Sequence, residues 1–159
     1  MIYDNGILDD RAIKWVAEAF DDMEHSISWL FRDDDNGIRF VYYSKWLDQL
    51  ETDFNSILMN IFKMFCEKNN INVEEVYMSR LTVMVQDKEP KVVLPEKAYP
   101  NPENVFIYFI SGSDRCMTIN DMPVMPIPGG CITVSGDVPY EFTVPNKDNF
   151  FMVAEIEYR

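Results

Sequence analysis

The chain has 159 residues, the size of one ordinary domain, and its 47% hydrophobic and 14% aromatic content is well above that of a disordered chain. Its net charge of −13 repels phosphate backbones and anionic membranes, so neither direct nucleic-acid binding nor membrane binding is expected. We therefore expect a single globular domain over residues 1–159.

Cysteine usage and hydropathy point to a soluble protein in reducing surroundings. Cys66, Cys116 and Cys131 form no CxxC pair, and an odd number of cysteines is a poor disulfide framework. The first residues lack the basic start and apolar stretch of a secretory signal, and apolar runs such as VFIYFI are too short to cross a bilayer.

The N-terminal part predicts a helix from about Asp9 to Glu24, with Asp9 as its N-cap. One apolar stripe follows from the three- and four-residue spacing of Ile13, Val16, Ala17 and Phe20. After it, Ser28 to Phe31 and Ile38 to Tyr43 are rich in aromatic and β-branched residues and predict a hairpin.

The acidic stretch RDDDNG separates the two halves of this predicted hairpin. Its carboxylates, Asp33, Asp34 and Asp35, are the only dense acidic run in the chain. Two interpretations apply: a solvated loop that contributes to solubility, or a contact surface that imitates the phosphates of DNA.

A second helix is predicted from Ser44 to about Lys68, because apolar residues recur along one face. From Glu75 onward, short runs of β-forming residues alternate with Pro, Gly, Asn and Asp, a pattern typical of an antiparallel sandwich or barrel. Between these runs, Pro90 to Pro102 contains four prolines and predicts a mostly irregular crossing. Two helices followed by a β-rich half indicate an α+β domain.

The segment from Arg80 to Tyr158 resembles the iron(II)- and 2-oxoglutarate-dependent oxygenases, in particular small prolyl-hydroxylase-like versions found in phage genomes. The resemblance rests on the order of SRLTVMV, the proline-rich loop, NVFIYFISGSD and MPIPGGCITVSGDVPYEFTVPNKDNFFMVAEIEY. It implies an antiparallel double-stranded β-helix, a jelly-roll or cupin-like barrel, with the two N-terminal helices packed on one sheet. It also implies a phage setting, in the host cytoplasm or the virion.

The same resemblance indicates which positions correspond to the family's site. Iron in such enzymes is held by two histidines and one carboxylate. Glu96 and Ala98 stand at the His-x-Asp motif, Tyr140 at the distal histidine, and Phe150 or Phe151 at the arginine that grips 2-oxoglutarate. Together with Arg80, these residues form the expected remnant of that site, and we expect no metal and no cofactor in it.

Other residues offer weaker chemistry. His25, the only histidine in the chain, follows the first helix and is a poor basis for a metal site. Cys116 and Cys131 fall in predicted strands and read as small buried hydrophobes. Glu155 and Glu157 share one face of the last strand, where paired carboxylates could catalyse hydrolysis, although such alternation usually marks a solvated face.

Three functional hypotheses follow. The first is a non-catalytic protein-interaction module, a phage structural or assembly component, whose former pocket is filled by side chains or holds an uncharged ligand beside Tyr140. The second is an acidic inhibitor of a host nucleic-acid enzyme or defence protein, with salt-sensitive binding that DNA competes. The third is an oxygenase with displaced ligands, which predicts iron binding and turnover of 2-oxoglutarate.

Overall fold

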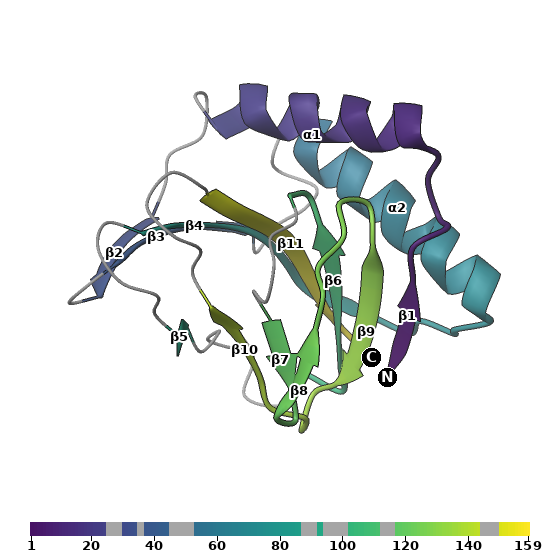
Figure 1. The fold of residues 1–159 in the computed structure, drawn as a ribbon. Coiled ribbons are helices and arrows are strands. Elements are labelled where there is room, and N and C mark those ends of the chain that lie inside the picture. Colours follow the sequence, from purple (N-terminus) through teal and green to yellow (C-terminus); the bar gives the residue numbers. More distant parts are fainter. Residues whose placement is uncertain are drawn as a thin grey trace.

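A computed structural model of the chain describes residues 1–24, 30–34, 37–44, 53–86, 92–93, 102–111, 117–143 and 150–159. It contains two helices and two antiparallel sheets, shown in Figure 1. The strands are β1 (Ile2–Asp4), β2 (Leu30–Asp34), β3 (Gly37–Ser44), β4 (Val76–Gln86), β5 (Val92–Val93), β6 (Asn104–Phe109), β7 (Met117–Ile119), β8 (Met122–Val124), β9 (Cys131–Ser135), β10 (Tyr140–Thr143) and β11 (Phe150–Tyr158).

The two sheets have different sizes. Seven strands form the larger sheet in the order β1-β9-β6-β11-β4-β3-β2, and four form the smaller one in the order β5-β10-β7-β8. Both helices cover one face of the larger sheet, and the smaller sheet lies on the other face (Figure 1). This is the expected α+β arrangement, a double-stranded β-helix with two N-terminal helices packed on one sheet.

Helix α1 (Asp10–Glu24) begins where the sequence predicts it. The Asp9 carboxylate accepts a hydrogen bond from the Ala12 amide at 2.8 Å, which satisfies one of the free donors of the first turn. Val16 and Phe20 on the predicted stripe are buried. The N-cap and the apolar spacing together therefore account for the position of this helix.

Helix α2 (Asp53–Asn69) starts later than predicted. The expected start at Ser44 is wrong, because Ser44 is the last residue of β3 and pairs with Ser79 of β4. The side chains of Phe62 and Phe65 meet the ring of Phe106 on the larger sheet, with centroids 5.0 and 5.1 Å apart. Burial of these rings fixes the helix on the sheet.

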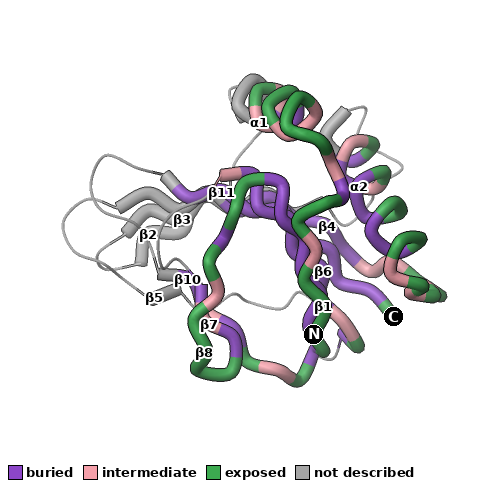
Figure 2. Tube along the Cα trace, turned by 45° about the vertical axis from the view of Figure 1, so that its right-hand side comes forward, coloured by how far each residue is buried: buried purple, intermediate pink, exposed green. Residues whose placement is uncertain are grey.

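Each face of the larger sheet has its own core. The helix-side core includes Phe20, Leu58, Phe65, Phe106 and Ile156. Side chains between the two sheets form the second core, which includes Val105, Ile107, Met117, Ile132 and Phe142. The described side chains of β6, β9 and β11 are almost all buried, whereas much of α1 and the outer turns of α2 face solvent (Figure 2).

The predicted hairpin around the acidic stretch is present as β2 and β3, which pair from Leu30 with Val41 to Asp34 with Gly37. The prediction that the carboxylates lie in a loop is wrong for two of them. Asp33 and Asp34 belong to β2, because the antiparallel pairing continues almost to the turn, and Asp35 lies outside the described residues. Neither described helix is long and apolar enough to span a membrane.

Within the expected proline-rich crossing, the described part is short. Val92 and Val93 form β5 and pair with Thr143 and Phe142 of β10. Residues 94–101 of this segment, which include Glu96 and Ala98, lie outside the described residues, as do His25 and Cys116.

Candidate functional site between the two sheets

Charged side chains are enclosed between the two sheets. Arg80 and Thr82 come from β4, Glu155 and Glu157 from β11, and Tyr140 from β10 of the smaller sheet. All are buried, and Arg80 and Glu155 are each 1% exposed. We call these residues the interior polar cluster.

Strand pairing places the cluster's ion pair. Arg80 and Glu155 are direct cross-strand partners in the antiparallel pair of β4 and β11, so their side chains leave the sheet side by side on one face. The guanidinium of Arg80 binds both carboxylate oxygens of Glu155 through Nε and Nη2, and the Nη2 to Oε1 distance is 2.8 Å. This two-point geometry is the strongest arrangement open to an arginine and a carboxylate.

Further contacts extend the cluster. The hydroxyl of Thr82 donates to Oε2 of Glu155 at 3.3 Å, and Nη1 of Arg80 lies 3.7 Å from Oε1 of Glu157. The hydroxyl of Tyr140 donates to Oε1 of Glu155 at 2.8 Å and accepts from Nη2 of Arg80 at 3.3 Å. Tyr140 therefore joins the smaller sheet to the ion pair of the larger one.

The electrostatics follow from this enclosure. Burial alone would lower the pKa of the Arg80 guanidinium, but the Glu155 carboxylate, with Tyr140 and Glu157, raises it above its ordinary value. Burial and the Glu155 carboxylate raise the pKa of the Tyr140 hydroxyl well above 10.0. Arg80 thus stays charged and Tyr140 stays a neutral donor at physiological pH.

Several predicted site residues meet here. Arg80 and Tyr140 were expected near one another, and they are in direct contact. Phe151 is fully buried in the same inter-sheet core, where its ring packs 5.6 Å from that of Phe142. Phe150 is described only by its backbone, which pairs with Val85 of β4.

The interpretation of Glu155 and Glu157 as residues of a solvated face is wrong. β11 is a central strand, flanked by β4 and β6 and covered on both faces, so both carboxylates are buried. The sequence FFMVAEIEY did indicate that these carboxylates are buried, because a strand that is apolar on both faces is typical of the centre of a sheet. A glutamate buried there requires a cation as its partner.

The described residues do not match an iron centre. Iron(II) oxygenases hold the metal with two histidines and one carboxylate. In the part of the chain that the structure describes, no group of three or more His, Cys, Asp or Glu side chains could hold a metal ion. At the expected distal position, the Tyr140 hydroxyl is engaged with Glu155.

Comparison with solved structures identifies the architecture. The chain matches a prolyl-4-hydroxylase from Pseudomonas putida at a TM-score of 0.65 and 10% identity, over 99% of this chain and 91% of that one. The chain has the fold of the iron(II)- and 2-oxoglutarate-dependent oxygenases. The α-ketoglutarate-dependent carbocyclase SnoK of nogalamycin biosynthesis gives a TM-score of 0.72 at 10% identity, over 99% of this chain and 78% of that chain.

A third match is the prolyl hydroxylase of Trichoplax adhaerens, solved in complex with a peptide fragment of hypoxia inducible factor. Its TM-score is 0.66 at 9% identity, over 99% of this chain and 82% of that chain. No family model and no curated protein sequence matches the chain. These neighbours are catalytic oxygenases, so the fold contradicts the expectation from sequence that the chain is not an enzyme.

Proposed function

We propose that this chain acts by binding another protein: a phage virion or assembly protein, or alternatively a host nucleic-acid enzyme or defence protein. The phage setting comes from the sequence resemblance. The bound protein could be a substrate on which the barrel acts, or a subunit with which the barrel assembles.

One observation carries this proposal: the exposed large apolar side chains collect at the edges of the two sheets. Among the described residues, all of them except Trp15 and Met64 lie on β1 or directly before it, on β8, or in the segment that follows β8. They are Met1, Ile2, Tyr3, Met122, Met125 and Ile127. Apolar side chains gathered at one region of a surface, with a polar surround, are typical of protein-binding sites.

The fold neighbours add support of a general kind. One of them, the hydroxylase from Trichoplax adhaerens, was solved with a peptide fragment bound. A protein of this architecture can therefore bind a piece of another protein.

The direct test is an affinity pull-down of the tagged protein from infected lysate, with and without added DNA, followed by mass spectrometry. Recovery of virion or assembly subunits that DNA leaves bound supports the first alternative. Recovery of a host nuclease or defence protein that DNA displaces supports the second, in which the −13 charge is the working surface. Recovery of no protein above an untagged control rejects the proposal.

An oxygenase reaction is the second candidate, favoured by the catalytic nature of the fold neighbours. It predicts that the purified protein binds iron(II) and converts 2-oxoglutarate to succinate in the presence of a substrate. Iron content after anaerobic loading and succinate formation with the recovered partner test it. If the protein neither retains iron nor forms succinate, this candidate is rejected and the first one is unaffected.

A further inference from the structure

The edge strand β1 and the segment after β8 approach each other at Gly130. A Cβ atom on Gly130 would lie 2.8 Å from the Tyr3 hydroxyl and 2.9 Å from the Ile127 carbonyl oxygen, so β1 and the segment after β8 are in contact there. Met125 and Met122 continue along that segment. We call the surface formed by Ile2, Tyr3, Met122, Met125 and Ile127 the apolar edge.

β1 and β8 are the outermost strands on this side of their sheets, and they differ as templates for another strand. β8 carries Pro123 opposite Thr118, one pair beyond the two-residue turn at Asn120 and Asp121. In such a hairpin, the pair next to the turn, Ile119 with Met122, is the hydrogen-bonded one. The next pair, Thr118 with Pro123, directs its backbone donors outward, and Pro123 has no N–H group. β8 therefore lacks an outward amide at this position, whereas β1 contains no proline, so each of its outward-facing residues has an amide to donate.

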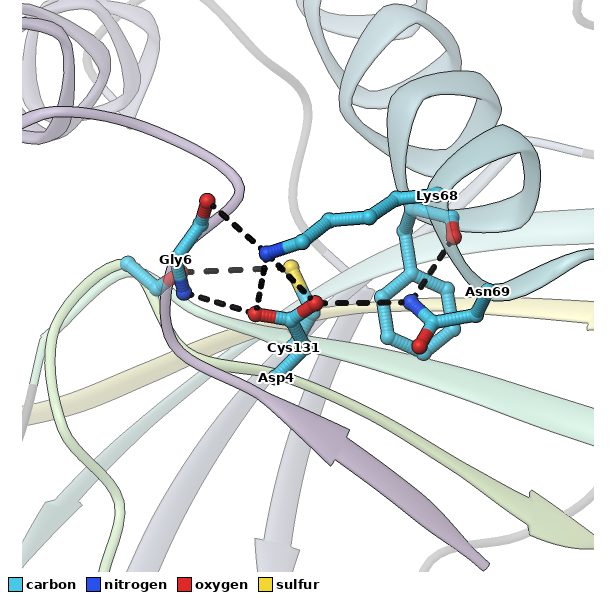
Figure 3. A network of polar contacts seen from close by, with 7 residues as sticks. Asp4, Gly6, Lys68, Asn69 and Cys131 are labelled. Atoms are coloured by element: carbon cyan, nitrogen blue, oxygen red, sulfur yellow. Dashed lines mark hydrogen bonds and ion pairs between the residues drawn. The ribbon is translucent and has the colours of Figure 1, made fainter.

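β1 is also held firmly on its inner side. It pairs with β9 from Ile2 opposite Thr133 to Asp4 opposite Cys131. Figure 3 shows the Asp4 carboxylate gripped by the end of α2, with Lys68 Nζ 2.9 Å from Oδ2 and 3.0 Å from Oδ1. Lys68 also donates to the Gly6 carbonyl at 3.2 Å, and the Gly6 amide donates to Asp4 at 2.8 Å.

This anchoring fixes how β1 presents its side chains. Successive side chains of a strand point to opposite faces, so Ile2 lies on the α2 side with Asp4, and Tyr3 lies on the opposite face toward Gly130. A strand added to β1 would place its side chains alternately beside Ile2 on one face and beside Tyr3 and Ile127 on the other.

Charge identifies the kind of partner. Residues 1–10 and 117–143 contain no lysine, arginine or histidine, and Lys68 of α2, which lies beside β1, is paired with Asp4. The other charged side chains of these two ranges are all acidic, and we call them the acidic rim: Asp9, Asp10, Asp121, Asp137 and Glu141. A basic segment complements this rim, whereas a second copy of the chain would bring another net charge of −13 against it.

We propose that the apolar edge receives an extended basic segment of a partner protein, which adds as a strand to β1 and lays apolar side chains over Tyr3 and Ile127. The partner's main chain bonds to β1, its apolar side chains contact the edge, and its Lys or Arg side chains face the acidic rim. This inference rests on the proposed protein-binding function and specifies its site and the partner's chemistry.

The test uses two fluorescein-labelled synthetic peptides, each about six residues long, the usual length of a strand. One alternates Lys with Val and the other alternates Glu with Val, so apolar content and length are matched. Fluorescence anisotropy with the full chain should show the Lys–Val peptide binding at least about tenfold more tightly. Hydrogen exchange should slow at the amides of Ile2 to Asp4 when that peptide is bound.

Two substitutions of similarly exposed side chains test where the peptide binds. Ile127 is 43% exposed on the apolar edge, and Met64 is 44% exposed on α2. Ile127→Gln should weaken the Lys–Val peptide several-fold, and Met64→Gln should leave it unchanged. Equal binding of the two peptides, no binding of either, unchanged exchange in β1, or equal effects of the two variants would each overturn the inference.

Failure here is distinguishable from failure of the proposed function. If the pull-down recovers a partner that binds Ile127→Gln as well as the unaltered chain, the protein-binding function stands and this site is wrong. If the pull-down recovers nothing, the function itself fails, whatever the peptides do.

Discussion

The hydroxyl of Tyr140 and the carboxylate of Glu155 connect the two sheets through a hydrogen bond of 2.8 Å. The tyrosine belongs to the smaller sheet and the glutamate to the central strand of the larger one. Because Glu155 is also the ion-pair partner of Arg80, this bond ends on a charged, fully buried acceptor. Such a bond contributes more to stability than one between neutral groups.

Replacing Tyr140 by Phe should therefore destabilise the fold more than an equivalent change elsewhere. Tyr158→Phe is the matched control, because the buried Tyr158 hydroxyl bonds to a neutral hydroxyl, that of Thr133, at 2.7 Å. We expect a loss of about 2–3 kcal/mol for Tyr140→Phe and about 1 kcal/mol for Tyr158→Phe in urea unfolding. Equal losses would show that the acceptor's charge does not matter.

Truncation of the same residue separates two roles of the barrel interior. If Tyr140 fills the interior, Tyr140→Ala lowers the unfolding temperature, because it removes a buried ring, but leaves binding of the recovered partner intact. Thermal melting and a binding assay on the same preparation measure both. Lost partner binding in a variant that melts like the unaltered chain would instead indicate a ligand pocket beside Tyr140.

The buried ion pair should show strong coupling. Arg80→Met leaves Glu155 without its cation in the interior, and we expect a loss of about 3–5 kcal/mol in the free energy of unfolding. Adding Glu155→Gln removes the charge left behind, so the double variant should be more stable than Arg80→Met alone. If the two single losses simply add, the carboxylate and the guanidinium are not coupled.

Asp4 makes the stability of the N-terminal strand depend on pH. The hydrogen bond from Lys68 holds the pKa of this carboxyl below its ordinary value of 3.8. Because the pKa is lowered by folding, the Asp4 carboxylate stabilises the fold fully at pH values above 3.8, and this stabilisation is lost as the pH falls through the lowered pKa. Because Lys68 is half exposed, Asp4→Asn should cost about 1 kcal/mol or less at neutral pH.

Urea unfolding of the Asp4→Asn variant and the unaltered chain should therefore converge once the pH falls well below 3.8. Lys68→Met in the Asp4→Asn background should add little, because the pair is already broken. A difference between Asp4→Asn and the unaltered chain that persists undiminished in acid would mean that the carboxylate's charge has no part in anchoring β1.

Much of the fold could be predicted from local pattern. β4, β6, β9 and β11 are long apolar runs bounded by turn residues, and the Asp9 cap marks the start of α1. β1 and β8 were missed because three-residue strands carry almost no periodicity and Pro123 argues against a strand. These strands form because β9 and β7 provide their hydrogen-bonding partners.

The interior polar cluster could be predicted only in part. Arg80 and Tyr140 were placed in one site by the resemblance to the oxygenases. Glu155 was assigned to a solvated face from strand alternation alone, whereas the apolar residues on both faces of β11 indicate a central strand that is covered on both sides. Glu96, Ala98, Asp35 and the metal reading of His25 lie outside the described residues, so they stay predictions.

The central claim is that this oxygenase-fold protein works by binding another protein. The most direct measurement is isothermal titration of the purified chain with each protein recovered in the pull-down, expressed and purified by itself. The account predicts saturable binding with defined stoichiometry for at least one of them. If none of the recovered proteins binds once it is purified, the claim is contradicted.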